Sequence, residues 1–355
     1  MSWRAVLCVV AAGACTPSPS PDAGSNGNNV ASAVDAGDRT SPSASVTSSA
    51  SASTPPAPPS EPEPTYDEIA AVLAIDGSAC SSSLPSEARI RCLYDQRYRG
   101  DAKAAGFAYE LWVKWKIVAG VERAYTMDGG YRGMIKIEPA TPLNGDRQHL
   151  EWIVGALRDF EQFFDDLARY GRDAGVAATS KLYRWRPITL RFFRSVAART
   201  PSAYADSWTV AYNLVGSLNK SADSVRETFF HELFHLNDYA RPSAGEKPWS
   251  NSALQPSFDP IWKKCNTSIP CLTPYTPTDT VVRGGTFYAF QPGNGPAGVE
   301  YAAELATRYY REQRAIFRGL PRVKPFKCGP SENGRAWSAM RDEYFGGIDA
   351  VPACP

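Results

Sequence analysis

Residues 16–65 set the first limit on what this chain can fold into, because they offer almost nothing to bury. The stretch holds ten prolines and twelve serines, and its only large apolar residues are three valines. So little apolar surface cannot offset the entropy lost on ordering a segment of this length. We therefore predict a disordered Ser/Pro/Ala-rich tether over residues 15–65 and a single folded domain over residues 66–355.

The residues before the tether are typical of an export signal. Arg4 precedes a short apolar run and a series of small residues that ends in Ala12-Gly13-Ala14-Cys15. This pattern predicts a signal peptide over residues 1–14. Its last four residues resemble a bacterial lipobox, which predicts lipidation of Cys15; an ordinary secretory signal is the alternative. Both interpretations predict an exported protein, either secreted or held in the cell envelope, at the outer membrane or the cell surface.

The cysteines after residue 15 number six, and an even number in an exported domain predicts disulfides. We expect sequence neighbours to pair, because the shortest loops close at the lowest entropic cost. A cysteine metal cluster is disfavoured, since the chain contains no Cys-x-x-Cys motif. The predicted pairs are Cys80–Cys92, Cys265–Cys271 and Cys328–Cys354.

Charge and hydropathy exclude two further classes. Lys and Arg total 38 against 37 Asp and Glu, a balance that gives no reason to expect a nucleic-acid partner. No apolar run approaches the ~20 residues of a bilayer-spanning helix, so membrane contact is expected only through the N-terminal lipid. The sequence carries no signal of oligomeric state, and we assume a monomer.

The folded part mixes two periodicities, which predicts an α+β fold. Apolar residues spaced three and four apart predict a long amphipathic helix over residues 146–170. Asp128-Gly129 between two alternating segments predicts a β-hairpin. We expect a β-rich N-terminal part over residues 66–140 and a second part over residues 141–355. The other expected helices cover residues 66–75, 222–239, 297–318 and 333–345, and the expected strands cover residues 107–118, 121–127, 131–139, 188–193 and 208–214.

The expected helix over residues 222–239 carries the motif His231-Glu232-Leu233-Phe234-His235. Imidazoles four residues apart lie one turn apart on one helix face, so their nitrogens can converge on one zinc ion. Glu232, beside that face, can take a proton from a water on the metal. Chance gives this pattern roughly once in a thousand such sequences. The alternatives are a zinc that only stabilises the fold and two exposed histidines.

A catalytic zinc needs a third protein ligand. No histidine follows His235, and His149 lies upstream on the long helix, where a surface position is the simpler interpretation. A carboxylate is therefore expected as the third ligand. Glu300 and Glu304 stand four residues apart on one face of the 297–318 helix and are the candidates.

The string HELFHLND followed by EYAAE resembles the gluzincin zinc metallopeptidases. It is most similar to the lethal-factor-like branch, which pairs HExxHxxD with a later ExxAE. The resemblance implies a zincin-like fold, with a mixed or antiparallel sheet packed on the long helix and the HExxH helix. The helix of the third ligand would then lie in a mainly helical C-terminal part.

The same resemblance implies roles for individual residues. His231, His235 and Glu300 would bind Zn²⁺, and Asp238 and Glu304 would hydrogen-bond the ligands. Relatives in that branch stabilise the oxyanion with a Tyr in the loop before the third-ligand helix. The candidates here are Tyr288 first, for which core packing is the alternative, and then Tyr301 and Arg283.

These observations predict a secreted or surface-tethered zinc metalloendopeptidase that cleaves peptide or protein substrates, with Glu232 as general base. The 208–214 strand is expected either as a sheet edge that pairs with an extended substrate or as an interior strand. Two other functions stay open. One is a non-catalytic, metal-stabilised surface lipoprotein that binds protein or glycan, which the intact Glu232 disfavours. The other is a zinc amidase acting on cell-wall crosslinks.

Overall fold

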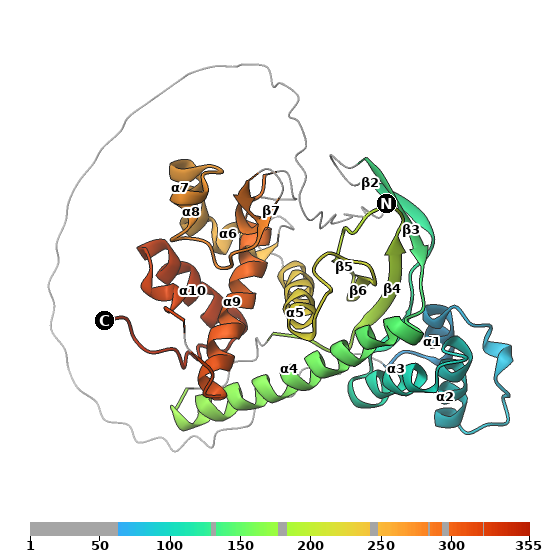
Figure 1. Ribbon diagram of the computed structural model, residues 1–355. Helices are drawn as coiled ribbons and strands as arrows, with labels where there is room; N and C mark the ends of the chain where they lie inside the picture. Colours follow the sequence, from blue (N-terminus) through green and yellow to red (C-terminus); the bar gives the residue numbers. More distant parts are fainter. Residues whose placement is uncertain are drawn as a thin grey trace, which may run out of the picture. The chain divides into compact units, whose positions relative to one another are not determined.

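The computed structural model of the chain is shown in Figure 1. The predicted signal peptide, Cys15, the tether up to residue 62 and Arg283 lie outside the residues that it describes. Among the helices of the described ranges, none has the length and apolar character needed to cross a membrane. The described residues are 63–128, 133–176, 183–241, 248–282, 285–292, 298–321 and 323–355.

The folded part begins with three helices, α1 (Tyr66–Leu73), α2 (Ser86–Arg97) and α3 (Ala102–Trp115). The helix at residues 66–75 is confirmed, whereas α2 was not predicted. Up to residue 140, these helices cover more of the described chain than its strands do. The prediction of a β-rich part over residues 66–140 is therefore wrong.

The strand predicted over residues 107–118 is replaced mainly by α3. Asp101 caps this helix by accepting a hydrogen bond from the Ala104 N–H at 3.1 Å. An alanine-rich first turn favours the helix further. Alternation of large apolar residues suited a strand, but the side chains that become buried follow a helical spacing. They are Ala104, Ala108, Leu111, Trp112 and Trp115.

A six-stranded mixed sheet follows in the order β2-β3-β4-β6-β5, with β1 also paired to β4. The predicted hairpin is present as the antiparallel pair β2–β3, while its turn at residues 129–132 lies outside the described residues. Strand β6 lies between β4 and β5, so the strand predicted over residues 208–214 is interior and β5 is the edge. The strands are β1 (Val118–Val121), β2 (Tyr125–Asp128), β3 (Met134–Pro139), β4 (Thr189–Ser195), β5 (Ala203–Asp206) and β6 (Thr209–Asn213).

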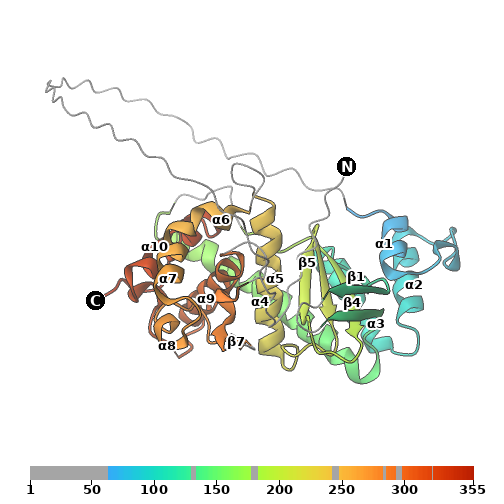
Figure 2. The ribbon, with the colours of Figure 1, turned by 90° about the horizontal axis from the view of Figure 1, so that it is seen from above.

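The remaining large helices match their predictions closely. The long helix α4 contacts α3, α5 and α9, as Figure 1 shows. Figure 2 shows α5 between the sheet and α9, in agreement with its contacts to β5 and α9. The coarse prediction of a chain with both helices and a mixed sheet is confirmed. These helices are α4 (Arg147–Asp173), α5 (Ala222–Tyr239), α9 (Val299–Phe317) and α10 (Ser331–Tyr344).

Short elements that were not predicted connect α5 to α9. Three of them are helices and two form a small antiparallel β-hairpin. They are α6 (Trp249–Ala253), α7 (Gln255–Cys265), α8 (Ile269–Leu272), β7 (Val281–Val282) and β8 (Thr286–Phe287).

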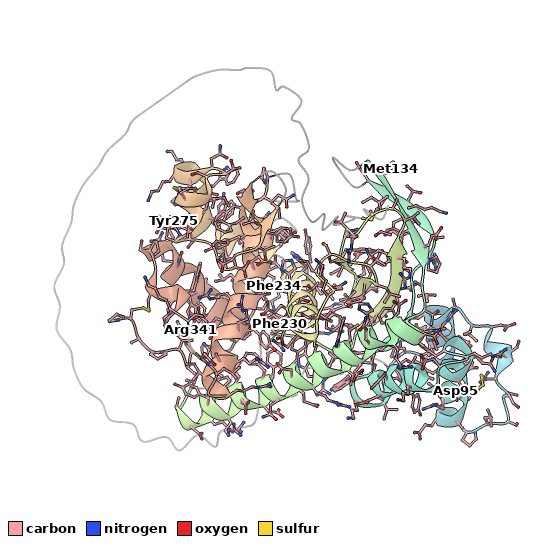
Figure 3. All side chains as sticks on the ribbon, in the orientation of Figure 1. Asp95, Met134, Phe230, Phe234, Tyr275 and Arg341 are labelled. Atoms are coloured by element: carbon pink, nitrogen blue, oxygen red, sulfur yellow. A yellow bond between two sulfur atoms is a disulfide. The ribbon has the colours of Figure 1, made fainter. Side chains whose placement is uncertain are left out.

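Aromatic side chains fill the space between α5 and its neighbouring helices. Phe230 stacks on Tyr310 of α9 with ring centroids 4.5 Å apart, and Phe160 of α4 meets Phe230 edge-on at 5.3 Å. One turn along α5, Phe234 meets Tyr344 of α10 at 5.1 Å. Figure 3 labels Phe230 and Phe234 on α5. Burial of these large rings fixes the rotation of α5 about its own axis.

A charged cluster joins α4 to α9. The Asp159 carboxylate accepts hydrogen bonds from Arg314 at 2.9 Å and from Tyr310 and Arg318. Burial raises the pKa of Asp159, but the hydrogen bonds from Arg314 and Tyr310 outweigh it and hold the pKa below its ordinary value. This cluster fixes α9 against α4, and with it the position of the first turn of α9.

The six cysteines form the three disulfides that were predicted from sequence distance. The paired Cα atoms are 5.9 Å apart for Cys80–Cys92 and 5.3 Å apart for the other two pairs. Cys265–Cys271 links α7 to α8, and Cys328–Cys354 ties the C-terminal segment to the turn before α10. These crosslinks restrain the loop before α2, the connection from α7 to α8 and the C-terminal segment.

Candidate metal centre

Helix α5 places the two histidines of the HExxH motif side by side. The helix begins at a capping box, in which the Ser221 hydroxyl accepts a hydrogen bond from the Ser224 N–H while the Ser224 side chain accepts from the Ser221 N–H. Two turns later, His231 and His235 are buried with their Nε2 atoms 3.0 Å apart. Both rings therefore face the same point, as their spacing of four predicts.

Glu300, in the first turn of α9, completes the group. Its Oε2 lies 3.1 Å from His231 Nε2 and 3.5 Å from His235 Nε2. All three side chains are buried, and together they form a group that could hold a metal ion. The structure thus brings together the three ligands that the sequence and its resemblance predicted.

The spacing and chemistry of these donors fit a zinc ion. Ligands about 2.1 Å from a tetrahedral ion lie about 3.4 Å from one another, close to the observed separations of 3.0 to 3.5 Å. Burial raises the pKa of Glu300, but the charges of His235 and His231 outweigh it and hold the pKa well below its usual range. The donor set is thus two imidazoles and one ionised carboxylate.

Glu232 is buried next to this group. Within the described residues, its Oε2 has no hydrogen-bond partner. Burial raises the pKa of Glu232 to about 7, against the opposing effect of His231 and His235. A buried oxygen without a partner costs free energy, and this one belongs to a residue that lines the cavity beside His231. A carboxyl group with a pKa near neutrality can both accept and return a proton.

Glu304 contacts the far side of one candidate ligand. Its Oε1 lies 3.1 Å from His231 Nδ1, on the opposite side of the ring from Glu300. The Thr278 hydroxyl donates a hydrogen bond to the other Glu304 oxygen. The contact implied for Glu304 is therefore present. Thr278 was missed, because no periodicity or motif ties a loop residue to a helix that begins 21 positions later.

Asp238 makes a different contact from the one that the resemblance implied. Its two oxygens accept hydrogen bonds from the Ser250 N–H at 2.8 Å and the Ser250 hydroxyl at 2.6 Å. Asp238 thus fastens the first turn of α6 to the end of α5, and no hydrogen bond to His235 is found among the described residues. Burial raises the pKa of Asp238 to about 6, and the charge of His235 opposes this rise. The effect of Asp238 on His235 is electrostatic.

Tyr288 lies at the site, as predicted. It follows β8 directly, and its ring centroid is 5.8 Å from that of His231. Burial raises its pKa well above the ordinary value, and a hydrogen bond with Glu300 adds to the rise. The phenol therefore stays protonated. The weaker candidate Tyr301 packs between Phe258 and Phe290 instead, with ring centroids 5.7 and 5.4 Å away.

His149 takes no part in this group. It is buried rather than at the surface, because its ring packs against Trp152 and against Tyr212 of β6. Its Nδ1 lies 2.8 Å from the Tyr212 hydroxyl of β6. The expectation of a surface position for His149 is wrong, whereas its exclusion as a ligand agrees with the geometry.

A cavity of about 550 Å³ opens beside the candidate ligands. His231, Glu232 and Tyr288 line it on the side of the candidate ligands His231, His235 and Glu300, called the metal group below. Ala203 of the edge strand β5 contributes to another side. This volume lies within the usual range for small-molecule and substrate sites. Of the three candidate ligands, His231 lines this cavity.

Comparisons with protein-family models, with curated proteins and with solved structures found no match to this chain.

Proposed function

We propose that this chain is a zinc-dependent hydrolase of the gluzincin type and that it cleaves peptide bonds. The observation that carries the proposal is the convergence of His231, His235 and Glu300 on one point, beside Glu232 with its unpartnered oxygen. Two imidazoles and a carboxylate are a donor set found in catalytic zinc sites, which leave one position open. The resemblance of the sequence to gluzincins implies the same arrangement, with two ligands on one helix and the third on a later helix.

The zinc ion and the side chains have different roles in the proposed reaction. A bound zinc ion supplies a Lewis acid for the peptide carbonyl and lowers the pKa of water held there. Glu232 takes the proton of the attacking water and returns it to the leaving amine. The Tyr288 hydroxyl donates a hydrogen bond to the oxygen on which negative charge develops.

Two other carboxylates support the ligands. Glu304 accepts a hydrogen bond from the Nδ1–H of His231, which leaves the Nε2 lone pair of that ring directed at the ion. Asp238 holds α6 against α5 and places negative charge near His235. Both effects strengthen the imidazoles as ligands.

The edge strand β5 offers a way to hold an extended substrate. It contacts α5, and its first residue, Ala203, lines the cavity. In the sheet its one neighbour among the described strands is β6, so no described strand competes with a peptide backbone for its other side. We assign this role to β5 in place of the interior strand β6.

The disulfides support export of the protein. Disulfides form and persist in oxidising compartments, and six cysteines of the described chain are paired. We therefore propose that the protein is secreted or tethered through a lipid on Cys15 and acts on peptide or protein substrates outside the cytoplasm.

The proposal is tested by a cleavage screen of the purified full-length protein, loaded with one equivalent of zinc. We expect hydrolysis of unfolded protein or mixed peptides that a chelator abolishes and added zinc restores. Cleavage of cell-wall crosslinks without peptide hydrolysis would support the amidase alternative. Zinc binding without any hydrolysis would support the non-catalytic binding protein.

A further inference from the structure

The cavity beside the metal group extends along α5 and α9 toward an ion pair between Glu227 and Arg311. Glu227 lies one turn before His231 on α5, and Arg311 lies eleven residues after Glu300 on α9, about 16 Å along that helix. Both residues line the cavity, and Arg311 Nε is 3.3 Å from Glu227 Oε1. The cavity therefore has a charged region that is separate from the candidate ligands.

Carboxylates outnumber cations along the described lining of this cavity. Glu227, Glu232, Asp279 and Glu304 line it, whereas Arg311 is its one Lys or Arg. A zinc ion and Glu300 together add one net positive charge, because metal-bound imidazoles are neutral. With every carboxyl group ionised, the four lining carboxylates, Arg311, the zinc ion and Glu300 together have two negative charges in excess. Such a lining attracts a cation and repels an anion.

A second cation can reach the Glu227 carboxylate of the Glu227–Arg311 pair. The two side chains are 34% and 44% exposed, and within the described part of the chain this ion pair is the one polar contact found for the Arg311 guanidinium. Arg311 can therefore turn toward solvent while a second cation shares Glu227. The hydroxyl of Thr228, one residue after Glu227 on α5 and also in the cavity lining, is a further acceptor for an ammonium group.

We propose that this cavity selects a basic substrate residue, Lys or Arg, whose charged end is received by Glu227. A Lys ammonium lies about 6 Å from its own backbone, which matches the one-turn offset between His231 and Glu227. Leu218 and Val282 line the same cavity and give apolar surface for the methylene stem. This inference rests on the proposed peptidase function and adds a substrate class to it.

The test uses three short peptide hydroxamates that differ only in the residue next to the hydroxamate, which is Lys, norleucine or Glu. The hydroxamate binds zinc and places that residue beside the metal group. Their dissociation constants are measured by calorimetry on the zinc-loaded full-length protein. We expect Lys to bind about two- to fivefold more tightly than norleucine, as one partly exposed charge pair allows, and Glu to bind most weakly.

Two variants assign the preference to the charged pair. Glu227→Gln should bring the ratio of the norleucine to the Lys dissociation constants to about one, whereas Arg311→Gln should raise it. The matched control is Glu151→Gln, an exposed carboxylate on α4 that should leave the ratio unchanged. Zinc content and the midpoint of unfolding in urea show that each variant is folded.

Each other result contradicts a distinct statement. Equal affinity for Lys and norleucine in the wild-type protein overturns this inference alone. Full Lys preference in Glu227→Gln overturns the role of Glu227. Failure of all three hydroxamates to bind, or failure of the protein to bind zinc, overturns the proposed function and this inference with it.

Discussion

The three histidines of this chain are all buried, yet they lie in two regions of opposite chemical character. His149, between α4 and the sheet, contacts the neutral hydroxyl of Tyr212. His231 lies between Glu300 and Glu304, and His235 lies beside Glu300. Burial alone therefore does not distinguish the three histidines; the carboxylates that lie against the imidazole nitrogens of His231 and His235 do.

The direction of the pKa shift expresses the same difference. Burial lowers the pKa of His149, and the smaller effects of Asp146 and Arg194 oppose one another. Burial also lowers the pKa of His231, but hydrogen bonds with Glu300 and Glu304 outweigh it, so that the pKa is raised. The carboxylates around His231 thus favour positive charge at its ring, which a bound metal ion would also supply.

The largest effect is expected from Glu232→Gln, which removes the proton acceptor and keeps the shape of the side chain. Hydrolysis should fall by about a thousandfold, while zinc content stays at the wild-type level, because Glu232 is not among the three candidate ligands. Initial rates and metal analysis of the same samples measure both. Glu151→Gln is the control, and turnover within tenfold of the wild-type rate would contradict the role of Glu232.

Glu304→Gln tests the carboxylate behind His231. Zinc affinity should fall about 10- to 100-fold, because the hydrogen bond to His231 Nδ1 loses its charge. Asp238→Asn should change the affinity less, since Asp238 bonds Ser250 instead of a histidine. Competition with a chelator of known affinity measures both variants. A larger loss of affinity in Asp238→Asn than in Glu304→Gln would reverse the assignment.

Asp159→Asn tests the charged cluster that joins α4 to α9. This cluster supports the fold and, within the described residues, does not contact the metal group. The free energy of unfolding at pH 7 should fall by about 2 kcal/mol, because Arg314 and Arg318 lose their charged partner. The pKa of Asp159 is lowered in the folded protein, so its contribution is present above its ordinary pKa of 3.8 and is lost as the pH falls toward the folded value.

Urea unfolding of both proteins at pH 7 and at acid pH checks this prediction. The wild-type and Asp159→Asn curves should converge at acid pH. A difference that grows as the pH falls would show that another group is responsible.

The smallest effect is expected from His149→Phe. The variant leaves the Tyr212 hydroxyl without its partner, which should cost about 1 kcal/mol of stability at pH 7 and leave zinc binding unchanged. Because the pKa of His149 is lowered on folding, the unfolded chain binds a proton that the folded protein resists, so wild-type stability falls as the pH drops below 6.5. Part of that fall should be absent from the variant. Loss of zinc in His149→Phe would contradict the separation of the two histidine regions.

The helices that build the site were predictable, because their signals are local. Apolar spacing fixed α4, and the four-residue spacing of His231 and His235 already places both rings on one face of α5. The spacing of Glu300 and Glu304 narrowed the third ligand to two carboxylates. Only the resemblance to a metallopeptidase chose between them, because that choice depends on how α9 approaches α5.

Other features depend on tertiary contacts or on competing local preferences. Asp238 was expected to hydrogen-bond a ligand histidine. Instead it accepts hydrogen bonds from Ser250, which lies beyond a connecting segment. The aromatic residues of α3 favoured a strand, and the alanine-rich start together with the Asp101 cap decided for a helix. The short helices α7 and α8 contain prolines, which conceal helical periodicity in a sequence.

The most direct test of the central claim is the zinc stoichiometry of the full-length protein and of three single histidine variants. We predict one tightly bound zinc per wild-type chain, the same in His149→Ala, and loss of tight binding in His231→Ala and His235→Ala. The absence of stoichiometric zinc from the folded wild-type protein, or its retention in both His231→Ala and His235→Ala, would contradict the account.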